Sequence, residues 1–396
     1  MDSGVRPAQG LSCEIKYCCL IFVTIKMPDP IYVTRSFLPR KEEYLKYLER
    51  PWASAMLTNH GELCQELESR LKKLLKVNHL VLVSNGSLAL HLAYKTLGLK
   101  GDVLTTPFTF AATSSVLRWE NCNPVFCDID RKTFCLSPQK VEEKITEAVS
   151  GIVPVHVFGN ACDVEKFEEI KLKHPGLKII YDAAHAFGVE YTKENGKVGS
   201  ILEHGDASIL SFHATKVFHC IEGGAVIVKD EDTENKIREF INFGYDSAGG
   251  GLNPLGTNCK LSEFHAAMGL AVLDDIDQIL EKRRKIVENY RRQLSKELEF
   301  QVHNKKSSEN YAYFPVILKD EIQLKNLVTL LNKKRVFPRR YFYPSLDTIS
   351  YSTSESYCPN SREISKRILC LPLFPDLNEN AQTGIIKLIN DFLKLK

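Results

Sequence analysis

The segment "HLVLVSNGSLALHLAYKTLGL", residues 79–99, joins two runs of different periodicity. Residues 79–84 form a short apolar run that is typical of a buried strand. After the turn Asn-Gly-Ser, the run from Leu88 onward predicts a helix, which ends at a glycine-containing turn. Another amphipathic helix is predicted just before the segment, at residues 62–77. A unit of helix, strand, tight turn and helix indicates an α/β fold.

The same alternation continues along the chain to about residue 230. Strands that alternate with helices predict a mainly parallel sheet that is covered by helices on both faces. Helices are predicted at residues 137–145 and 163–174, with Ser137 and Asp163 as their N-caps. The further predicted strands are residues 102–108, 123–129, 151–159, 177–183, 206–212 and 223–230, and one more helix is predicted at 112–119.

The pattern changes in the last third of the chain. Residues 261–299 predict a long helix that is broken once. Strand and helix patterns then resume in a smaller unit. We therefore expect three parts: an N-terminal extension at residues 1–26 that lies outside the fold, a large domain at 27–299 and a small C-terminal α/β domain at 300–396.

The overall composition is that of a soluble globular protein. Of the 396 residues, 44% are hydrophobic and 26% are charged, and the net charge of +3 includes no basic block that would suggest nucleic acid binding. The Lys/Arg cluster at residues 281–293 predicts a solvated helix face. The apolar run at 17–25 is too short to span a bilayer and precedes no cleavage site, so we expect no membrane association, a cytoplasmic protein and Met27 as its natural start.

The twelve cysteines are scattered along the chain. They form no C-x-x-C pair and no grouping with zinc-finger spacing, so we expect no metal site. Scattered thiols in a long chain are typical of a reducing compartment. Cys220 is expected to be a small buried residue rather than a nucleophile.

Residues that can carry chemistry follow the predicted strands, where the ligands of doubly wound sheets bind. The turn Gly86-Ser87 opens a helix and offers an anion site, although a simple helix cap uses the same residues. Asp182 ends a buried strand, either as the partner of a positive charge or as a helix N-cap, and His185 follows it. Lys216 follows another strand, although lysines ordinarily lie on solvated faces. The other candidates are Ser211, His213 and the aromatic residues Phe108 and Phe110, which by default belong to the core.

Together these residue types fit pyridoxal phosphate. This cofactor needs a lysine for its Schiff base, a carboxylate against its pyridine nitrogen, a phosphate cradle and an aromatic ring. Lys216 and Asp182 can meet across the crevice, and the pair Gly223-Gly224 lets the backbone pass closely. No G-x-G-x-x-G follows a strand and no P-loop is present, so nicotinamide and nucleoside triphosphate are disfavoured. The predicted cradle residues are Gly86, Ser87 and Ser211.

From about Ile31 to the C-terminus, the sequence resembles the nucleotide-sugar aminotransferases of the DegT/DnrJ/StrS group, which are pyridoxal-phosphate enzymes of fold type I. Nine motifs in the family's order carry the resemblance, which implies that the large domain binds the cofactor. The motifs are "LTNHGELCQELE", "SNGSLALHLA", "TPFTFAAT", "PVFCDID", "PVHVFGNACDVE", "IIYDAAHAFG", "SFHATKVFHCIEGGA", "GTNCKLSEFHAAMGL" and "RRYFYPSL".

The resemblance implies a role for each matched position. Lys216 matches the Schiff-base lysine, Asp182 the partner of the pyridine nitrogen, and His185 the residue beside the ring's phenolic oxygen. Phe110 matches the stacking aromatic, with Phe108 as the fallback. Asn258 matches an asparagine that the neighbouring subunit gives to the phosphate, so the resemblance implies a homodimer with shared active sites. The implied phosphate ligands are Gly86, Ser87 and Ser211, with His213 as a neighbour of that site.

The implied reaction moves an amino group from L-glutamate to a nucleotide-linked keto-deoxysugar, for amino-sugar and polysaccharide biosynthesis. Two departures from the family pattern concern the substrate: "HCIEGG" at residues 219–224 replaces "TGEGG", and Lys260 replaces an arginine. The nucleotide and the aminated carbon stay open.

Three alternatives stay open as well. Sugar dehydratases share the fold, but they carry histidine at the position of Lys216. A pyridoxal-phosphate-binding regulatory protein without turnover would keep the same site residues. An amino-acid aminotransferase would use Arg339 and Arg340 as a carboxylate clamp.

Overall fold

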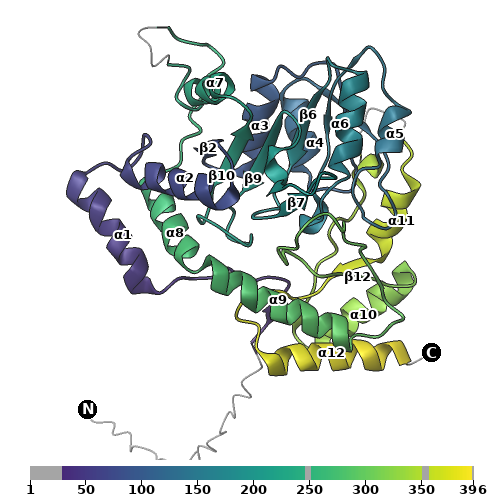
Figure 1. The fold of residues 1–396 in the computed structure, drawn as a ribbon. Coiled ribbons are helices and arrows are strands. Elements are labelled where there is room, and N and C mark those ends of the chain that lie inside the picture. The colour runs from purple at the N-terminus through teal and green to yellow at the C-terminus, as the bar shows by residue number, and fades with distance from the viewer. Residues whose placement is uncertain (1–28, 246–250, 350–355, 395–396) are drawn as a thin grey trace, which may run out of the picture.

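A seven-stranded sheet forms the core of the larger part of the computed structural model, which describes residues 29–245, 251–349 and 356–394 (Figure 1). The predicted extension at residues 1–26 therefore lies outside the described residues. The sheet is parallel except for β10, which runs antiparallel to both of its neighbours. The prediction of a mainly parallel sheet is confirmed. The strand order is β2 (His79–Val83), β10 (Gly224–Val228), β9 (Ala207–Ser211), β6 (Lys178–Asp182), β5 (Val149–Val153), β3 (Asp102–Thr105) and β4 (Asn123–Phe126).

Helices cover both faces of this sheet, which explains why its strands are apolar throughout. Successive side chains of a strand point to opposite faces, so Leu80 and Leu82 of β2 pack in one core cluster and Val81 and Val83 in another. The first face is covered by α2 (Glu62–Leu75), α6 (Val164–Lys173) and α8 (Glu263–Asp274), and the second by α3 (Gly86–Thr96), α4 (Ala112–Trp119) and α7 (Glu231–Ile241).

Most predicted helices occur at the expected positions. The hydroxyl of Ser137 caps α5 (Pro138–Glu142), which is shorter than predicted, and the carboxylate of Asp163 caps α6. The predicted break in the long helix lies at Asp275, between α8 and α9 (Ile276–Gln293). Among the elements that were not predicted are α1 (Lys41–Ser54), α7 and the hairpin of β7 (Glu190–Thr192) and β8 (Val198–Ser200).

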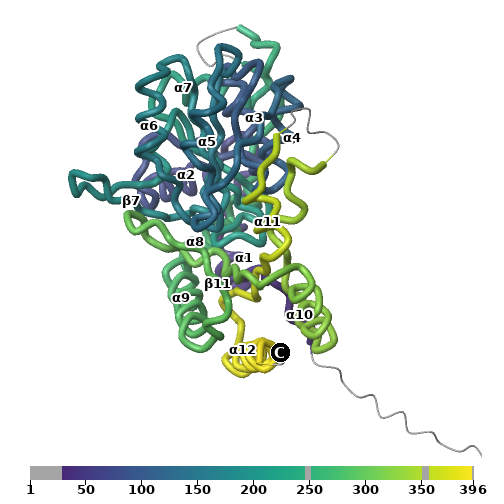
Figure 2. Tube along the Cα trace, turned by 90° about the vertical axis from the view of Figure 1, so that its right-hand side faces the viewer, coloured from purple at the N-terminus to yellow at the C-terminus, as the bar shows by residue number. Residues whose placement is uncertain are grey.

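A smaller unit follows the long helices and contains its own sheet, in which β12 (Pro315–Ile317) lies between β11 (Glu299–Phe300) and β14 (Ile368–Cys370). Strand β1 (Ile31–Tyr32) pairs with β13 (Val336–Phe337), so the first described residues pack against this unit. Figure 2 shows α9, α10 and α12 together at one end of the molecule. The domain boundary at residues 299–300 stays a prediction. The helices of this unit are α10 (Glu321–Lys333), α11 (Pro359–Arg367) and α12 (Glu379–Lys394).

The Lys/Arg cluster of residues 281–293 lies on α9, and one of its members is not solvated. Arg283 is only 2% exposed and donates to the carbonyl oxygens of Tyr311 and Ala312, at 3.1 and 3.3 Å. The prediction of a solvated face is therefore wrong for Arg283. The reason is that α9 lies between the two units, so its inner side contacts the segment that enters the small unit.

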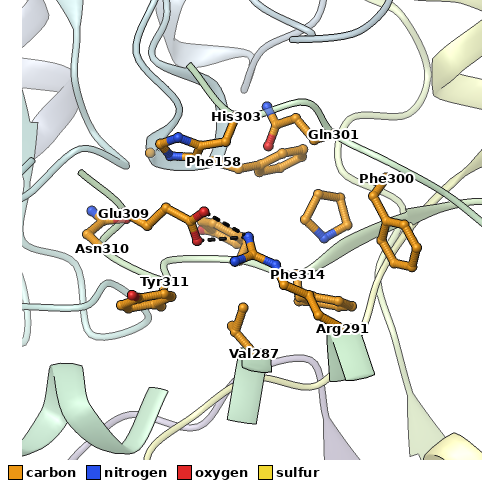
Figure 3. Close-up of a pocket in the computed structure, with 13 residues that line it drawn as sticks. Phe158, Val287, Arg291, Phe300, Gln301, His303, Glu309, Asn310, Tyr311 and Phe314 are labelled. Carbon is orange, nitrogen blue, oxygen red and sulfur yellow. Dashed lines mark hydrogen bonds and ion pairs between the residues drawn. The ribbon is translucent and has the colours of Figure 1, made fainter. Parts of the chain in front are cut away.

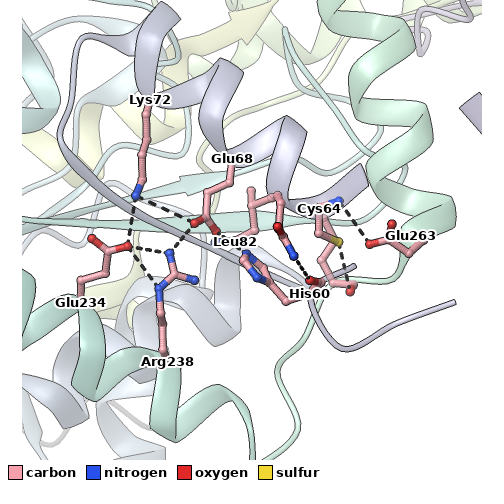
Figure 4. Close-up of polar contacts among 10 residues, drawn as sticks. His60, Cys64, Glu68, Lys72, Leu82, Glu234, Arg238 and Glu263 are labelled. Atoms are coloured by element: carbon pink, nitrogen blue, oxygen red, sulfur yellow. Dashed lines mark hydrogen bonds and ion pairs between the residues drawn. The ribbon is translucent and has the colours of Figure 1, made fainter. Parts of the chain in front are cut away.

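A cluster of charged side chains holds β2 between α2 and α7 (Figure 4). The Glu68 carboxylate accepts a hydrogen bond from the Leu82 N–H of β2 at 3.2 Å and forms an ion pair with Arg238 of α7. Glu234 pairs with Arg238 at 2.6 Å and with Lys72 at 3.1 Å. Burial by itself raises the pKa of both carboxyls, but the hydrogen bonds from their basic neighbours outweigh it and hold each pKa below its usual value. The cluster therefore fixes the strand that leads into Gly86-Ser87.

We expect this cluster to make the fold less stable in acid. A carboxyl with a lowered folded pKa contributes stability above its unfolded pKa of about 4.3, and this contribution is lost as the pH falls through the folded value. Glu68→Gln should lower the free energy of unfolding by about 3 kcal/mol at neutral pH, because it removes one of the two carboxylates that pair with Arg238. Thermal unfolding midpoints measured from neutral to acid pH test this. A Glu68→Gln protein as stable as wild type would contradict it.

Candidate active site

A pocket of about 330 Å³ lies beyond the carboxyl ends of β2, β6 and β9, and this size suits a small ligand. It lies where ligands of doubly wound sheets bind. Asn258 is exposed and does not line the pocket. The other predicted site residues all line it: Gly86, Ser87, Phe110, Asp182, His185, Ser211, His213 and Lys216.

One end of the pocket is a cradle in which three strand ends approach closely. A Cβ on Gly86 would lie 2.8 Å from the Ser211 Cβ, and a Cβ on Gly224 would lie 2.7 Å from the Asn85 carbonyl oxygen. Only glycine permits these approaches, as predicted for the pair that includes Gly224. The cap of α3 is the Asn85 side chain, which accepts the Leu88 N–H at 2.9 Å, and not Gly86 or Ser87.

Gly86 and Ser87 are instead the first two residues of α3. Their backbone N–H groups have no partner within the helix, because the first turn of any helix leaves its donors free. With the Ser211 side chain beside them, these donors suit a phosphate. The cradle thus fits the phosphate group of the predicted cofactor.

Asp182 is the last residue of β6 and is buried. Its Oδ2 accepts the Thr113 hydroxyl at 2.7 Å, and its Oδ1 accepts the Ala184 N–H at 3.1 Å. Burial raises the pKa of this carboxyl, although the two hydrogen bonds and the charge of Lys216 act to lower it. The helix-cap alternative is wrong, because residues 183–189 form turns and no helix.

Lys216 lies in a turn after β9. Its backbone N–H donates to the His213 carbonyl oxygen at 2.9 Å and closes this turn. Burial lowers the pKa of its amine to about 8, and the nearby Asp182 carboxylate opposes this shift. The amine is therefore partly neutral near physiological pH and available as a nucleophile. Lys216 therefore lines the pocket and does not lie on a solvated face, as most lysines do.

His185 is held as a neutral ring at the wall of the pocket. Its Nδ1 accepts the Phe158 N–H at 3.2 Å, so the hydrogen of the neutral imidazole is assigned to Nε2. Its ring stacks parallel to those of Phe158 and Phe342, with centroids 6.0 and 5.9 Å apart. Burial and the charge of Lys216 hold its pKa well below the usual value. A neutral Nε2–H donor suits a ligand oxygen.

The two candidate aromatic residues differ in burial. Phe110 is 65% exposed and lines the pocket, whereas Phe108 is fully buried and packs edge-to-face on Phe134, Phe158 and Phe342. Phe108 is therefore core, which leaves Phe110 as the ring available to a ligand.

Several residues of the pocket were not predicted, and three come from the small unit: Tyr313, Tyr341 and Phe342. The sequence places them 97 to 126 residues after Lys216, with no spacing that indicates a shared site. The His213 ring contacts Thr215 at 2.8 Å and Glu222, another lining residue, at 3.5 Å.

The alternative carboxylate clamp receives no support from the pocket. Neither Arg339 nor Arg340 lines it. The Arg340 guanidinium pairs with Glu321 at 3.0 Å and lies 3.5 Å from the centroid of the Tyr343 ring.

Figure 3 shows a neighbouring cavity, which shares Tyr313 with the pocket. The Arg291–Glu309 ion pair lies at its side, at 2.8 Å. At about 60 Å³ it is too small for a substrate, and it contains none of the predicted site residues.

Cys220 is fully buried and lies outside the pocket lining, and burial raises its pKa, so the prediction of a buried residue is confirmed. Within the described ranges, no group of three His, Cys, Asp or Glu side chains is placed to hold a metal ion. No helix in the described part of the chain is long and apolar enough to cross a membrane.

Comparisons with known proteins agree with this geometry. A model of the DegT/DnrJ/EryC1/StrS aminotransferase family matches residues 39–390. The chain is 40% identical over 372 residues to the dTDP-4-amino-4,6-dideoxy-D-glucose transaminase of Shigella dysenteriae, covering 92% of this chain and 100% of that protein. It is 30% identical to the GDP-perosamine synthase of Vibrio cholerae, covering 88% and 95%. The solved structure of DesI in the presence of its TDP-sugar product matches with a TM-score of 0.84 and 32% identity over 92% of both chains, which confirms the predicted fold class.

Proposed function

The chain belongs to the DegT/DnrJ/EryC1/StrS aminotransferase family, and from this premise we propose that it transfers an amino group from L-glutamate to the keto group of a dTDP-linked 6-deoxysugar. The chain is a pyridoxal-phosphate-dependent nucleotide-sugar aminotransferase. The observation that carries the proposal is the convergence of Lys216, Asp182 and the glycine cradle on one pocket. The choice of nucleotide rests on the dTDP and TDP sugars in the names of two relatives.

The residues of the pocket have chemically suitable places around the cofactor. Pyridoxal phosphate supplies an aldehyde that exchanges one amine for another and a pyridine ring that takes up electrons from the substrate carbon. The Lys216 amine would hold the aldehyde carbon. Once the substrate amine displaces it, Lys216 would take the proton from the substrate carbon and return it, and a pKa of about 8 suits both roles.

The other residues would hold and orient the group. The Asp182 carboxylate would keep the ring nitrogen protonated, and His185 Nε2–H would donate to the ring's phenolic oxygen. The phosphate would bind the first N–H groups of α3 together with Ser87 and Ser211. The exposed ring of Phe110 would cover the face of the pyridine, and His213 would lie beside the phosphate site.

Two half-reactions test this proposal. Purified protein loaded with pyridoxal phosphate is mixed with L-glutamate, and the cofactor absorbance and 2-oxoglutarate are measured. Keto-deoxysugars linked to dTDP, UDP or GDP are then added in turn. We expect the absorbance to shift with glutamate and to return with the dTDP-linked sugar. A protein that binds the cofactor but shows no absorbance shift with glutamate would be the regulatory alternative. If the absorbance returned only with UDP- or GDP-linked sugars, the assignment of dTDP as the nucleotide would be wrong.

We also propose that the protein is a homodimer with shared active sites. Asn258 is exposed and outside its own chain's pocket, which suits a role in a partner's site. Large exposed apolar side chains occur in α1, in the loop after it and in the segment before Asn258, as expected where a partner chain covers them. They are Trp52, Met56, Leu57, Phe243, Tyr245, Leu252 and Leu255.

A mixing experiment tests the shared site. Lys216→Ala and Asn258→Ala chains each form defective sites as homodimers, because the first lacks the amine and the second lacks a phosphate ligand. Co-refolded or co-expressed together, they form mixed dimers in which one of the two sites has both native residues. We expect activity to reappear in the mixture. Independent sites within each chain would leave the mixture no more active than the sum of the separate variants.

A further inference from the structure

The Asp182 carboxylate is contacted by the hydroxyl of Thr113, the last residue of the motif "TPFTFAAT", whose role the sequence did not indicate. We propose that Thr113 is a positioning residue, which together with Thr109 holds the Asp182 carboxylate ionised and aimed at the cofactor's ring nitrogen. This inference rests on the proposed function, because it concerns the partner of the pyridine ring.

Thr113 is fully buried in the first turn of α4. Its Oγ1 lies 2.7 Å from Asp182 Oδ2 and 2.8 Å from Thr109 Oγ1. Its carbonyl oxygen accepts the Tyr94 hydroxyl of α3 at 3.1 Å. A threonine in a helix ordinarily bonds its hydroxyl back to a carbonyl three or four residues earlier. Here the hydroxyl lies between two side chains, so it links the pocket residue Thr109 to the buried carboxylate.

The direction of these hydrogen bonds follows from the number of hydrogens. An ionised carboxylate only accepts, and a threonine hydroxyl has one hydrogen to give. With Asp182 ionised, Thr113 therefore donates to it, and Thr109 donates to Thr113. A protonated Asp182 would reverse this chain: its Oδ2 would donate to Thr113, which would turn its own hydrogen toward Thr109. Only in the charged form do both oxygens accept, from the Thr113 hydroxyl and the Ala184 N–H, and these two hydrogen bonds lower the pKa of Asp182 against its burial.

The charge needs this support because the site is buried. Burial raises the pKa of Asp182, and the groups that oppose it are the Thr113 hydroxyl, the Ala184 N–H and Lys216. The other titratable groups facing Asp182 or its loop are Tyr94 and His185, whose pKa values burial shifts toward the neutral forms, so they supply no charge. When Lys216 bonds to the cofactor, Thr113 and Ala184 N–H remain as the chain's own donors to the carboxylate.

Two substitutions separate the hydroxyl from the shape of the side chain. Thr113→Val removes the hydroxyl and keeps the volume, whereas Thr113→Ser keeps the hydroxyl. We expect Thr113→Val to lower kcat by about tenfold to a hundredfold, the loss typical of one hydrogen bond to a charged group. Its acid limb of activity should move to higher pH, because Asp182 loses a bond that lowers its pKa. Thr113→Ser should stay within a few-fold of wild type.

A readout independent of turnover uses pyridoxal phosphate labelled with ¹⁵N in its ring. Apoprotein is reconstituted with the labelled cofactor, and the nitrogen shift is followed against pH. We expect the ring nitrogen to be protonated in wild type and in Thr113→Ser. In Thr113→Val the pKa of this nitrogen should be lower, so that it loses its proton at a lower pH than in wild type. If Thr113→Val does not fold, Thr109→Val should change the titration in the same direction by a smaller amount, because it removes the donor behind Thr113.

The outcomes distinguish this inference from the proposed function. A wild-type protein that binds no cofactor or transfers no amino group overturns the proposed function, and this inference with it. A wild-type protein that transfers normally, beside a folded Thr113→Val protein with an unchanged nitrogen titration and pH profile, overturns the inference alone. A lower unfolding temperature as the sole change in Thr113→Val would also overturn it, because Thr113 would then only support the fold.

Discussion

Replacing Lys216 by alanine is expected to abolish amino transfer and to remove the near-visible absorbance of the lysine-bound cofactor. The substitution removes both the covalent attachment and the amine that would move the proton, so the rate should fall by more than about 10⁴-fold. The fold should persist. Burial lowers the Lys216 pKa to about 8, so the charged amine is costly in its place and its removal relieves that cost. Absorbance spectra, turnover and thermal unfolding measure all three effects.

Lys236→Ala is a matched control for this experiment. Lys236 lies on α7, where its amine donates to the Thr96 carbonyl at 3.1 Å, and it does not line the pocket. Its loss should leave absorbance and turnover as in wild type. A Lys216→Ala protein that keeps the absorbance band and even a few per cent of wild-type turnover would show that another group attaches the cofactor.

The central part of the site was predictable because its residues follow strands with clear apolar signals. In a parallel sheet the carboxyl ends of the strands meet at one edge, so Ser87, Asp182 and Lys216 had to converge once β2, β6 and β9 were recognised. The residue types then restricted the cofactor. The same reasoning could not choose between a helix cap and a charge partner for Asp182, because the sequence does not mark whether a helix or a series of turns follows β6.

The residues that were missed depend on tertiary contacts. Tyr313, Tyr341 and Phe342 reach the pocket only because the small unit packs against the large one. The contact of Thr113 with Asp182 depends on how α4 approaches β6. Helix α1 was missed because it has Pro51 within it and buries little of its own surface, so its sequence carries a weak helical pattern.

Asp182→Asn is expected to preserve the fold and the coloured cofactor while amino transfer falls by at least about a hundredfold. Asparagine keeps the shape but cannot keep the ring nitrogen protonated by charge, so the ring loses most of its power to take up electrons. The local hydrogen bonds can adapt: the amide oxygen accepts the Ala184 N–H, and the amide nitrogen donates to the Thr113 hydroxyl, which turns toward Thr109. The covalent bond to Lys216 does not need the charge, so the absorbance should remain.

Asp163→Asn separates this effect from that of replacing any aspartate. The Asp163 carboxylate caps α6 by accepting the Lys166 N–H at 3.3 Å, and asparagine is an equally good N-cap, so this variant should keep wild-type turnover. Amino transfer and absorbance are measured side by side in both proteins. If Asp182→Asn is as active as Asp163→Asn, the Asp182 carboxylate does not face the pyridine nitrogen. If Asp182→Asn alone loses turnover while both keep their colour, the buried charge at the end of β6 is what the reaction needs.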